Sequence, residues 1–541
     1  MQKPRLVPAG QGFSSLNTVE YKNRFLYSKY NPTQAIQKTL DSLTILPGTI
    51  VIACSPALWY GLETLEEKCG DTSMIIAFEA DEVLCEFAKE NLPKEKNIPL
   101  FSKKTLLKMD SLIREKTLTG NYRRVIRIDM SAGVQFEGEL YSRVEASSED
   151  IVASFWKSRV TITLLGRLFA KNIFKNLTLI KKGLTLSDVR KTVEKPILVC
   201  GAGESLDATL KDIKGMEKDF FILAVDASLS CLRENHICPH AAVGVESQLA
   251  IQKAYIGFKG NEFPVFLDIC SRTQVARMFS DRVIWFCSEY AHGEFLKKIE
   301  ENFFEGAVLP PLGSVGLSAV CIALALRKDD SIPIFVSGLD FSFSAGRTHA
   351  KSAPAELARL SSCTKIIPHE NYSALLPPCF AVQTKDGSKM FTTPSMALYA
   401  KMFCEQFSGM QNVYDSGLCG LSLGIEQKKP QAGQFKNQSE KKSAFEIKLE
   451  EKNSSKNPRD FYRKEKEALL EIKDLLTNGE NSSHREKTIS LTQQLENLLK
   501  EREYLYLHFP DGYKLSMESP FLKRVRAELD PFLRIMEEGS L

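Results

Sequence analysis

The sequence contains no Cys-x-x-Cys pair and no cysteine and histidine group at the spacing of a zinc site, although its 541 residues include 13 cysteines. This absence excludes the common zinc-finger arrangements. Several cysteines, among them Cys54, Cys200, Cys287 and Cys321, stand in apolar runs, where cysteine behaves as a small apolar residue. We therefore expect reduced, buried thiols, as in proteins of a reducing compartment.

A large excess of charge of one sign is also lacking. The chain has 71 Lys and Arg against 67 Asp and Glu, a net charge of +4. This balance does not indicate nucleic acid as the main partner. The first 21 residues contain no apolar segment of signal-peptide length, so we expect a cytoplasmic protein that is not exported by that route.

One run of twenty residues, 307–326, carries no charge and has the length of a membrane span. Pro310, Pro311 and Gly313 interrupt its first half, and the remainder is too short to cross a bilayer as a helix. We therefore expect a loop that enters a buried helix, and no membrane partner.

The length of the chain predicts two or three domains. Residues 1–190 alternate helical patterns with short apolar runs and predict a Rossmann-like N-terminal domain, whereas residues 191–425 are densest in strand-like runs. Residues 426–460 are charged and poor in large apolar residues, which predicts a linker. In residues 461–541, Leu and Ile recur at helical spacing and predict a helical C-terminal region.

Residues 191–425 carry continuous apolar runs rather than alternating ones. Strands that are covered on both faces require this pattern, and helical segments separate several of the runs. The sequence therefore predicts an α/β fold with an open parallel sheet and helices on both of its faces. The expected strands lie at 197–200, 220–225, 241–245, 264–268, 282–286 and 333–337.

Residues 48–92 predict a strand, a turn, a helix, a second strand and a second helix. Glu79 and Asp81 end the second strand, where an acid in a dinucleotide site binds ribose hydroxyls. The preceding turn, however, holds Trp59 and Tyr60 in place of glycines. We therefore expect a Rossmann-like N-terminal domain that binds no cofactor.

The segment ILVCGAGESLDATL, residues 197–210, places two glycines and a serine where a buried strand ends. Gly201 and Gly203 allow backbone amides to approach an anion, and Ser205 can cap the following helix or bind a phosphate. A Gly-x-Gly-x-Ser turn alone is weak evidence, because a tight strand-to-helix turn with an N-cap has the same sequence.

Further polar residues follow the other expected strands. Because the carboxyl ends of parallel strands meet at one edge of a sheet, these residues are candidates for a common site. His349 is a candidate base, although a lone histidine is more often structural. The residues at these strand ends are Asp226, Glu246, Asp268, Gly338, Asp340, Arg347 and His349, and Gly313 and Ser314 form a second glycine-serine turn.

Together, these segments and the stretch VQTKDGSKMFTTPSMALYAKMF resemble the motility-associated factor (Maf) glycosyltransferases over about residues 190–425. The N-terminal segments LYSKYNPTQAIQ and CSPALWYGLETL are similar to that family more loosely. Members of this family modify flagellin with nonulosonic acids. Their central domain, called domain of unknown function 115, resembles bacterial sialyltransferases that use CMP-activated sugars.

The resemblance implies transfer of a sialic, pseudaminic or legionaminic type sugar from a CMP-sugar to a Ser or Thr hydroxyl of flagellin. The family turn is usually Gly-x-Gly-Pro-Ser-Leu, and Glu204 replaces its proline here. The sialyltransferase histidine base has no counterpart in VQTKDGSKMFTTP, so His349 is the first candidate, with Asp340 and Glu246 in reserve. The expected donor contacts are Gly201, Gly203, Glu204, Ser205, Asp226, Gly313, Ser314 and Gly338; Asp268, Arg347 and Lys351 are expected to contact the sugar.

A CMP-sugar releases a single phosphate, which backbone amides can stabilise, and no Asp-x-Asp pair occurs in the sequence. We therefore expect no cofactor and no metal. Two alternatives remain open. Archaeal pterin diphosphokinases resemble the same domain, and that chemistry requires ATP and Mg²⁺ held by acids such as Asp226, Asp268 and Asp340. In the second alternative, the protein is a noncatalytic flagellin-binding assembly factor.

Overall fold

The computed structural model describes residues 3–9, 16–291, 293–367, 372–431, 443–451, 457–478 and 485–540. Its contacts divide the chain into two compact units, Met1–Leu165 with Leu507–Ser516, and Gly166–Tyr506 with Met517–Leu541. The helix α5 (Gly138–Leu177) runs from the first unit into the second. The domain limits expected at 190, 425 and 460 differ from this division, and they remain predictions.

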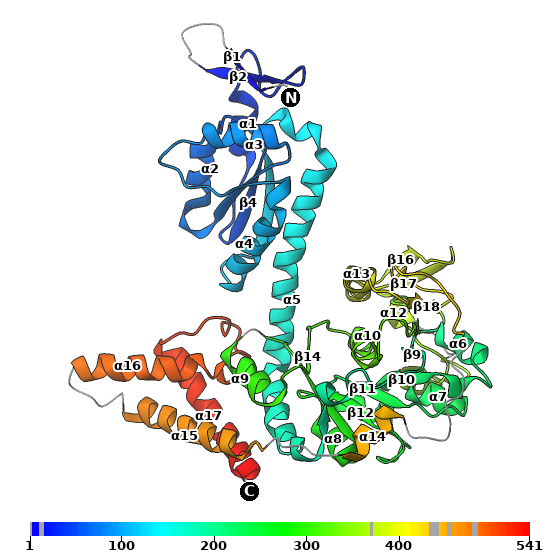
Figure 1. The fold of residues 1–541 in the computed structure, drawn as a ribbon. Coiled ribbons are helices and arrows are strands. Elements are labelled where there is room, and N and C mark those ends of the chain that lie inside the picture. The colour runs from blue at the N-terminus through cyan, green and yellow to red at the C-terminus, as the bar shows by residue number, and fades with distance from the viewer. Residues whose placement is uncertain are drawn as a thin grey trace. The chain divides into compact units, whose positions relative to one another are not determined.

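The first unit contains a parallel sheet in the order β6-β5-β4-β7, whose central strand β4 is buried along its whole length (Figure 1). Ile50 and Ile52 pack on one face against α4 and α5, while Val51 and Ala53 pack on the other against α1 and α2. The bounds are β4 Thr49–Cys54, β5 Met74–Glu79, β6 Leu100–Ser102, β7 Arg124–Asp129, α1 Gln34–Ser42, α2 Leu62–Cys69, α3 Glu82–Glu90 and α4 Leu106–Leu118.

Two smaller elements complete the first unit. The strands β1 (Arg5–Pro8), β2 (Asn17–Tyr21) and β3 (Arg24–Phe25) form an antiparallel sheet. The late segment 507–516 joins the unit through Arg159, whose Nη2 donates hydrogen bonds to the carbonyl oxygens of Leu507 at 3.1 Å and Phe509 at 3.0 Å. The C-terminal part of the sequence therefore contributes to the N-terminal fold, which no local pattern predicts.

The second unit contains a parallel sheet in the order β14-β13-β12-β11-β10-β9-β15-β18, with β8 beside β13. The continuous apolar runs explain why its inner strands are buried on both faces, and the predicted open parallel α/β sheet is confirmed. The bounds are β8 Leu184–Thr185, β9 Ile197–Cys200, β10 Phe221–Val225, β11 Ala241–Gly244, β12 Val265–Asp268, β13 Val283–Ser288, β14 Val308–Leu309, β15 Ile334–Ser337 and β18 Val413–Asp415.

The strand order reverses between β9 and β15. From β9 the chain adds strands in one direction as far as β14, and β15 then returns to pair with the free side of β9. In open α/β sheets, ligands bind beyond the carboxyl ends of the strands at such a switch point. The topology therefore marks one location for a site before any side chain is considered.

Helices surround this sheet. The predicted loop followed by a buried helix is found at α10 (Val315–Leu326), which packs against β9 and β10. None of the helices in the described ranges is long and apolar enough to span a membrane. The other bounds are α6 Leu206–Asp212, α7 Leu229–Glu234, α8 Thr273–Phe279, α9 Glu294–Phe303, α11 Pro354–Ser361, α12 Tyr372–Leu375 and α13 Pro394–Phe407.

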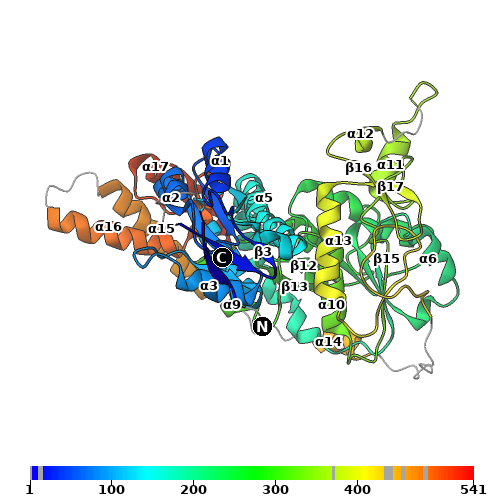
Figure 2. The same cartoon turned by 90° about the horizontal axis from the view of Figure 1, so that it is seen from above.

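A hairpin of β16 (Phe380–Gln383) and β17 (Lys389–Thr392) follows α12, and Figures 1 and 2 both place the hairpin beside that helix. It is tied to the chain after β15 by two backbone hydrogen bonds between Phe343 and Phe391, of 2.8 and 2.9 Å. The hairpin therefore lies over the same end of the sheet as the switch point.

The C-terminal region is helical, as predicted. It comprises α15 (Arg459–Asn478), α16 (Arg485–Lys500) and α17 (Ser519–Ser540). The expected linker 426–460 lies partly outside the described residues, at 432–442 and 452–456. Between these gaps, α14 (Ala444–Glu451) buries Phe445 against Phe221 of the sheet, with ring centroids 5.1 Å apart, so this part of the expected linker is packed.

Candidate functional site at the sheet switch point

The two glycines of the first turn allow the ends of β9 and β15 to approach each other. The amide of Gly201 donates to the carbonyl oxygen of Ser337 at 2.7 Å, and that of Gly203 donates to Gly338 at 2.8 Å. A Cβ atom on Gly201 would lie 2.2 Å from the Gly338 oxygen, and one on Gly203 would lie 2.5 Å from Asp340 Oδ2. The close approach therefore requires glycine at both positions.

Ser205 and Asp340 bond to each other beneath this turn. The amide of Ser205 donates to Asp340 Oδ2 at 2.8 Å, its hydroxyl donates to Oδ1, and the amide of Gly338 donates to the hydroxyl oxygen at 3.1 Å. Ser205 makes no side-chain cap bond to α6. Burial raises the pKa of Asp340 to about 6, against the lowering effect of the Ser205 hydrogen bonds. Both groups therefore hold the turn together.

The amides of Ala202 and Glu204 remain as candidates for an anion. Those of Gly201, Gly203 and Ser205 donate to protein oxygens. Within the described ranges, the amides of Ala202 and Glu204 have no such acceptor. Anion capture by the amides that flank the glycines remains a prediction, restricted to these two groups.

The Glu204 side chain faces the loop after β15. Its Oε1 accepts a hydrogen bond from the amide of Ser344 at 2.6 Å, and its Oε2 lies 3.1 Å from Nε of Arg347. Nη1 of Arg347 lies 2.6 Å from Oδ2 of Asp207 in α6. The predicted sugar contact Arg347 is therefore paired with two carboxylates, and Glu204 anchors the loop that carries it.

His349 is oriented by two neighbours. Its Nδ1 lies 2.9 Å from the hydroxyl oxygen of Thr348, and that hydroxyl in turn donates to Oε1 of the buried Glu356 at 3.2 Å. Because the hydroxyl proton is used toward Glu356, the hydroxyl oxygen accepts from Nδ1–H. Nε2 is then the unprotonated nitrogen. Burial lowers the pKa of His349, against the opposing effect of Glu356, so the ring is neutral near pH 7.

The ends of β10 and β11 bring two predicted acids together. Asp226 is buried, and burial raises its pKa to about 7; the Ala227 amide opposes this shift and the charge of Glu246 adds to it. Glu246 is half-buried and its Oε1 accepts from the amide of Gln248 at 2.9 Å. This edge therefore holds a carboxyl group that titrates near neutrality.

Around these acids lie buried polar atoms without hydrogen-bond partners. Tyr255 belongs to this group, and its nearness to Asp226 contributes to raising its pKa, after burial itself. Since buried polar groups are normally paired, such atoms at a strand-end edge indicate groups that a ligand can satisfy. Among the described residues here, the atoms are Ser247 Oγ, Tyr255 Oη, Arg272 Nε and Thr273 Oγ1.

Other predicted residues have packing contacts. Asp268 is buried, and its two oxygens accept from the amides of Cys270 at 2.8 Å and Ser288 at 2.9 Å. Gly313 has a φ of +66°, and a Cβ there would lie 3.2 Å from the Tyr399 ring. The carbonyl of Ser314 accepts from the amide of Ser318 at 3.1 Å in α10. The exposed Lys351 contributes its amide to Asp207 at 3.3 Å.

Sequence reasoning missed a buried ion pair beside the turn. Lys385 Nζ lies 2.5 Å from Asp415 Oδ2, with side chains 8% and 3% exposed. A Cβ on Gly417 would lie 2.9 Å from Ser205 Oγ and 3.2 Å from Lys385 Nζ, so the ammonium lies close to the turn. The available sequence signal was Lys385 itself, the first of the two lysines in the stretch VQTKDGSKMFTTP.

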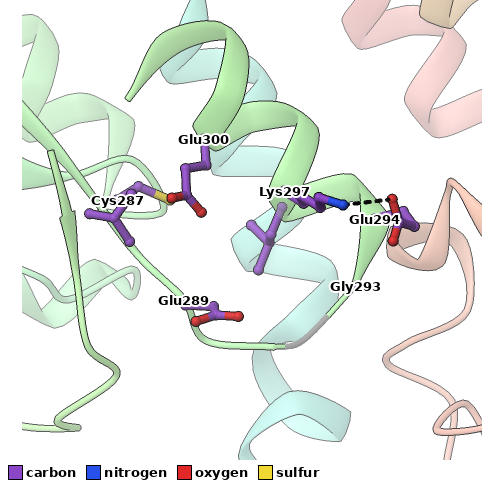
Figure 3. Close-up of a pocket in the computed structure, with 8 residues that line it drawn as sticks. Cys287, Glu289, Gly293, Glu294, Lys297 and Glu300 are labelled. Atoms are coloured by element: carbon purple, nitrogen blue, oxygen red, sulfur yellow. Dashed lines mark ion pairs between the residues drawn. The ribbon is translucent and has the colours of Figure 1, made fainter. Parts of the chain in front are cut away.

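A pocket of about 190 Å³ lies elsewhere in the second unit, between the end of β13 and α9 (Figure 3). None of the predicted site residues lines it. Glu503 accepts from the amides of Glu294 at 2.7 Å and Phe295 at 3.1 Å and so caps α9, the helix that lines the pocket. The lining residues are Cys287, Glu289, Gly293, Glu294, Leu296, Lys297, Glu300 and Val308.

In the first unit, the strand-end acid Glu79 is buried and its Oε1 accepts from the hydroxyl of Tyr141 at 2.7 Å. The indole of Trp59 is buried and donates to the carbonyl of Ala88 at 2.7 Å. Oε1 of Glu79 and the Trp59 indole are thus paired with protein groups, whereas Oε2 of Glu79 is buried without a hydrogen-bond partner. Across the ranges that the structure describes, no group of three or more His, Cys, Asp or Glu is placed to hold a metal ion.

The fold defines an α/β protein with Rossmann-like parallel sheets and a helical C-terminal region. Residues 169–346 match the family described as 6-hydroxymethylpterin diphosphokinase MptE-like. An uncharacterized protein of Treponema pallidum (strain Nichols) is 28% identical over 562 aligned positions, which cover 98% of this chain and 95% of that protein.

The solved structure of the Maf glycosyltransferase from Magnetospirillum magneticum AMB-1 is similar with a TM-score of 0.54 at 13% sequence identity. The similarity covers 100% of this chain and 92% of that chain. The resemblance predicted from the sequence is therefore confirmed for the fold, over the whole length of the chain.

Proposed function

We propose that this protein is a glycosyltransferase that moves a nonulosonic acid from a CMP-sugar to Ser or Thr hydroxyls of flagellin. The observation that carries the proposal is the fold shared with a Maf glycosyltransferase over the whole chain. The grouping of Glu204, Arg347 and His349 around the β9–β15 switch point supports it further.

The proposed reaction uses this chain's own groups. The acceptor hydroxyl oxygen attacks the anomeric carbon of the sugar, the bond from that carbon to the phosphate oxygen breaks, and CMP leaves with the bonding electrons. The hydroxyl proton passes to Nε2 of His349, the nitrogen left bare by the Thr348 contact. The amides of Ala202 and Glu204 stabilise the phosphate that is released.

Binding measurements on the full chain test the donor. CMP and CMP-N-acetylneuraminate should raise the melting temperature, because a ligand at about 100 times its Kd stabilises the folded state by about 2.7 kcal/mol. Intact-mass measurement of flagellin from a strain that lacks this protein tests the acceptor. An unchanged flagellin mass would contradict the transferase proposal.

A pterin-type diphosphokinase is the second candidate, and the family match over residues 169–346 favours it. This function predicts stabilisation by ATP with Mg²⁺ rather than by CMP. A noncatalytic flagellin-binding assembly factor is the third, and it predicts no response to either nucleotide. The same melting experiment therefore separates all three.

A further inference from the structure

Arg347 is held by two carboxylates that contact different nitrogens of its guanidinium group. Glu204 contacts Nε and Asp207 contacts Nη1. In the described part of the chain, Nη2 has no hydrogen-bond partner. A carboxylate bound in the usual bidentate way uses two adjacent nitrogens of the fork, so neither acid has the strongest available geometry.

Each of the two carboxylates also accepts from backbone of the loop that carries Arg347. Glu204 accepts from the amide of Ser344 at 2.6 Å, and Asp207 accepts from that of Lys351 at 3.3 Å. The side chains of Glu204, Asp207 and Arg347 are 11%, 21% and 27% exposed, so a ligand arriving from solvent can reach this group.

The charges of this group do not balance. Two carboxylates face one guanidinium, which leaves one negative charge beside the amides of Ala202 and Glu204. Such a surplus opposes the binding of any anion that Arg347 does not contact. A ligand that carries its own carboxylate can take the place of Glu204 on Arg347, because it offers an equivalent partner, whereas a neutral sugar cannot.

We propose that Glu204 is an internal stand-in for a ligand carboxylate: an acidic sugar displaces Glu204 from Arg347, and the donor site thereby selects sugars that carry a carboxylate. This inference rests on the proposed glycosyltransferase function. The incoming carboxylate bridges Nε and Nη2, while Asp207 keeps its contact with Nη1. Glu204 is therefore a specificity residue that acts through Arg347.

Calorimetry on the full chain tests this selection with CMP-N-acetylneuraminate and its carboxyl methyl ester. The ratio of the Kd of the ester to the Kd of the acid isolates the contribution of the carboxylate. Glu204→Gln should raise this ratio about fivefold, because the internal competitor is weakened. Arg347→Met should reduce the ratio to about one, and adding Glu204→Gln to Arg347→Met should not restore it.

Asp212→Asn is the matched control. Asp212 lies on α6, the helix that carries Asp207, and it pairs with Lys429 at 3.2 Å, away from Arg347. It should leave the ratio unchanged. Arg347→Lys, which keeps the charge but loses the fork, should give an intermediate ratio and replaces Arg347→Met if that variant does not fold. If CMP binds but Glu204→Gln leaves the ratio unchanged, or neither Arg347 variant alters it, the inference is overturned. Absence of any CMP or CMP-sugar binding would instead overturn the proposed function on which it rests.

Discussion

The amide of Gly203 donates a hydrogen bond to the carbonyl oxygen of Gly338 at 2.8 Å, across the point where the strand order of the sheet reverses. A second hydrogen bond runs from the amide of Gly201 to the carbonyl oxygen of Ser337. Together, the two bonds join the ends of β9 and β15 and the loops that follow them. These loops carry Glu204 on one side and Arg347 and His349 on the other. These backbone contacts therefore determine how far Glu204, on the loop after β9, lies from Arg347 and His349, on the loop after β15.

Gly201→Ala should destabilise the second unit by about 1–3 kcal/mol, the range for overpacking a tightly packed region. The added Cβ meets backbone on Gly338, which no rotamer change can relieve. Urea unfolding measures the loss. Gly409→Ala is the control, because a Cβ at that position has no atom within 4 Å. Equal stability of the two variants would show that the loops do not need the close approach.

The buried pair of Lys385 and Asp415 should respond strongly when only one partner is removed. Asp415→Asn or Lys385→Met leaves a buried charge without compensation and should cost about 3–5 kcal/mol. The double variant should cost less than the sum of the two. Lys328, which pairs with Glu194 and is 57% exposed, is the contrast: Lys328→Met should change the free energy of unfolding far less than either buried variant. If the cost of the double variant equalled the sum of the two single costs, Lys385 and Asp415 would not be directly coupled.

Much of the fold could be predicted from the sequence because the sheet strands are buried on both faces. The runs at 197–200, 241–245 and 333–337 appear as β9, β11 and β15 within one residue of their predicted ends. The strand order could not be predicted, since continuous apolar runs do not specify which strands pair. The same holds for the segment 507–516, which joins the first unit through Arg159 rather than through a local pattern.

The candidate site was predictable as a location and less so as a set of contacts. The polar residues that follow the expected strands indicated Asp226, Asp340 and Arg347 as site residues. The sheet brings the loops that carry them to one edge. Which of these groups bond to each other depends on side-chain direction. The Ser205 bond to Asp340 and the Glu204 bond to Arg347 join residues more than 130 positions apart, and no spacing rule reaches that far.

Asp226 should make stability depend on pH between about 4 and 7. Its pKa is about 7 in the folded chain and near 3.9 when unfolded, so the unfolded chain loses this proton first as pH rises. Asp226 therefore destabilises the fold progressively over that window, and Asp226→Asn should remove this cost. The gain should be small near pH 4 and reach about 1–3 kcal/mol at pH 8. A gain that is the same at both pH values would contradict the raised pKa.

The contact of His349 with Thr348 should be visible in the rate of the proposed reaction. Thr348→Val removes the acceptor for Nδ1–H, so Nε2 is no longer kept free of the proton. We expect kcat to fall by about tenfold to a hundredfold, with KM changed less than about twofold. Thr161→Val, at an exposed threonine of α5, is the control. Unchanged kcat in Thr348→Val would exclude this orienting role.

Glu356→Gln should shift the acid limb of the same rate profile. The base must be unprotonated, so the rate falls as pH drops through the pKa of His349, which burial places below 6.5. Glu356 and Glu204 raise this pKa and Arg359 lowers it. Removing the charge of Glu356 therefore lowers the pKa further and moves the acid limb to lower pH. Because a purely structural Glu356 would lower kcat without moving the limb, the direction of the shift identifies His349 as the base that Glu356 acts upon.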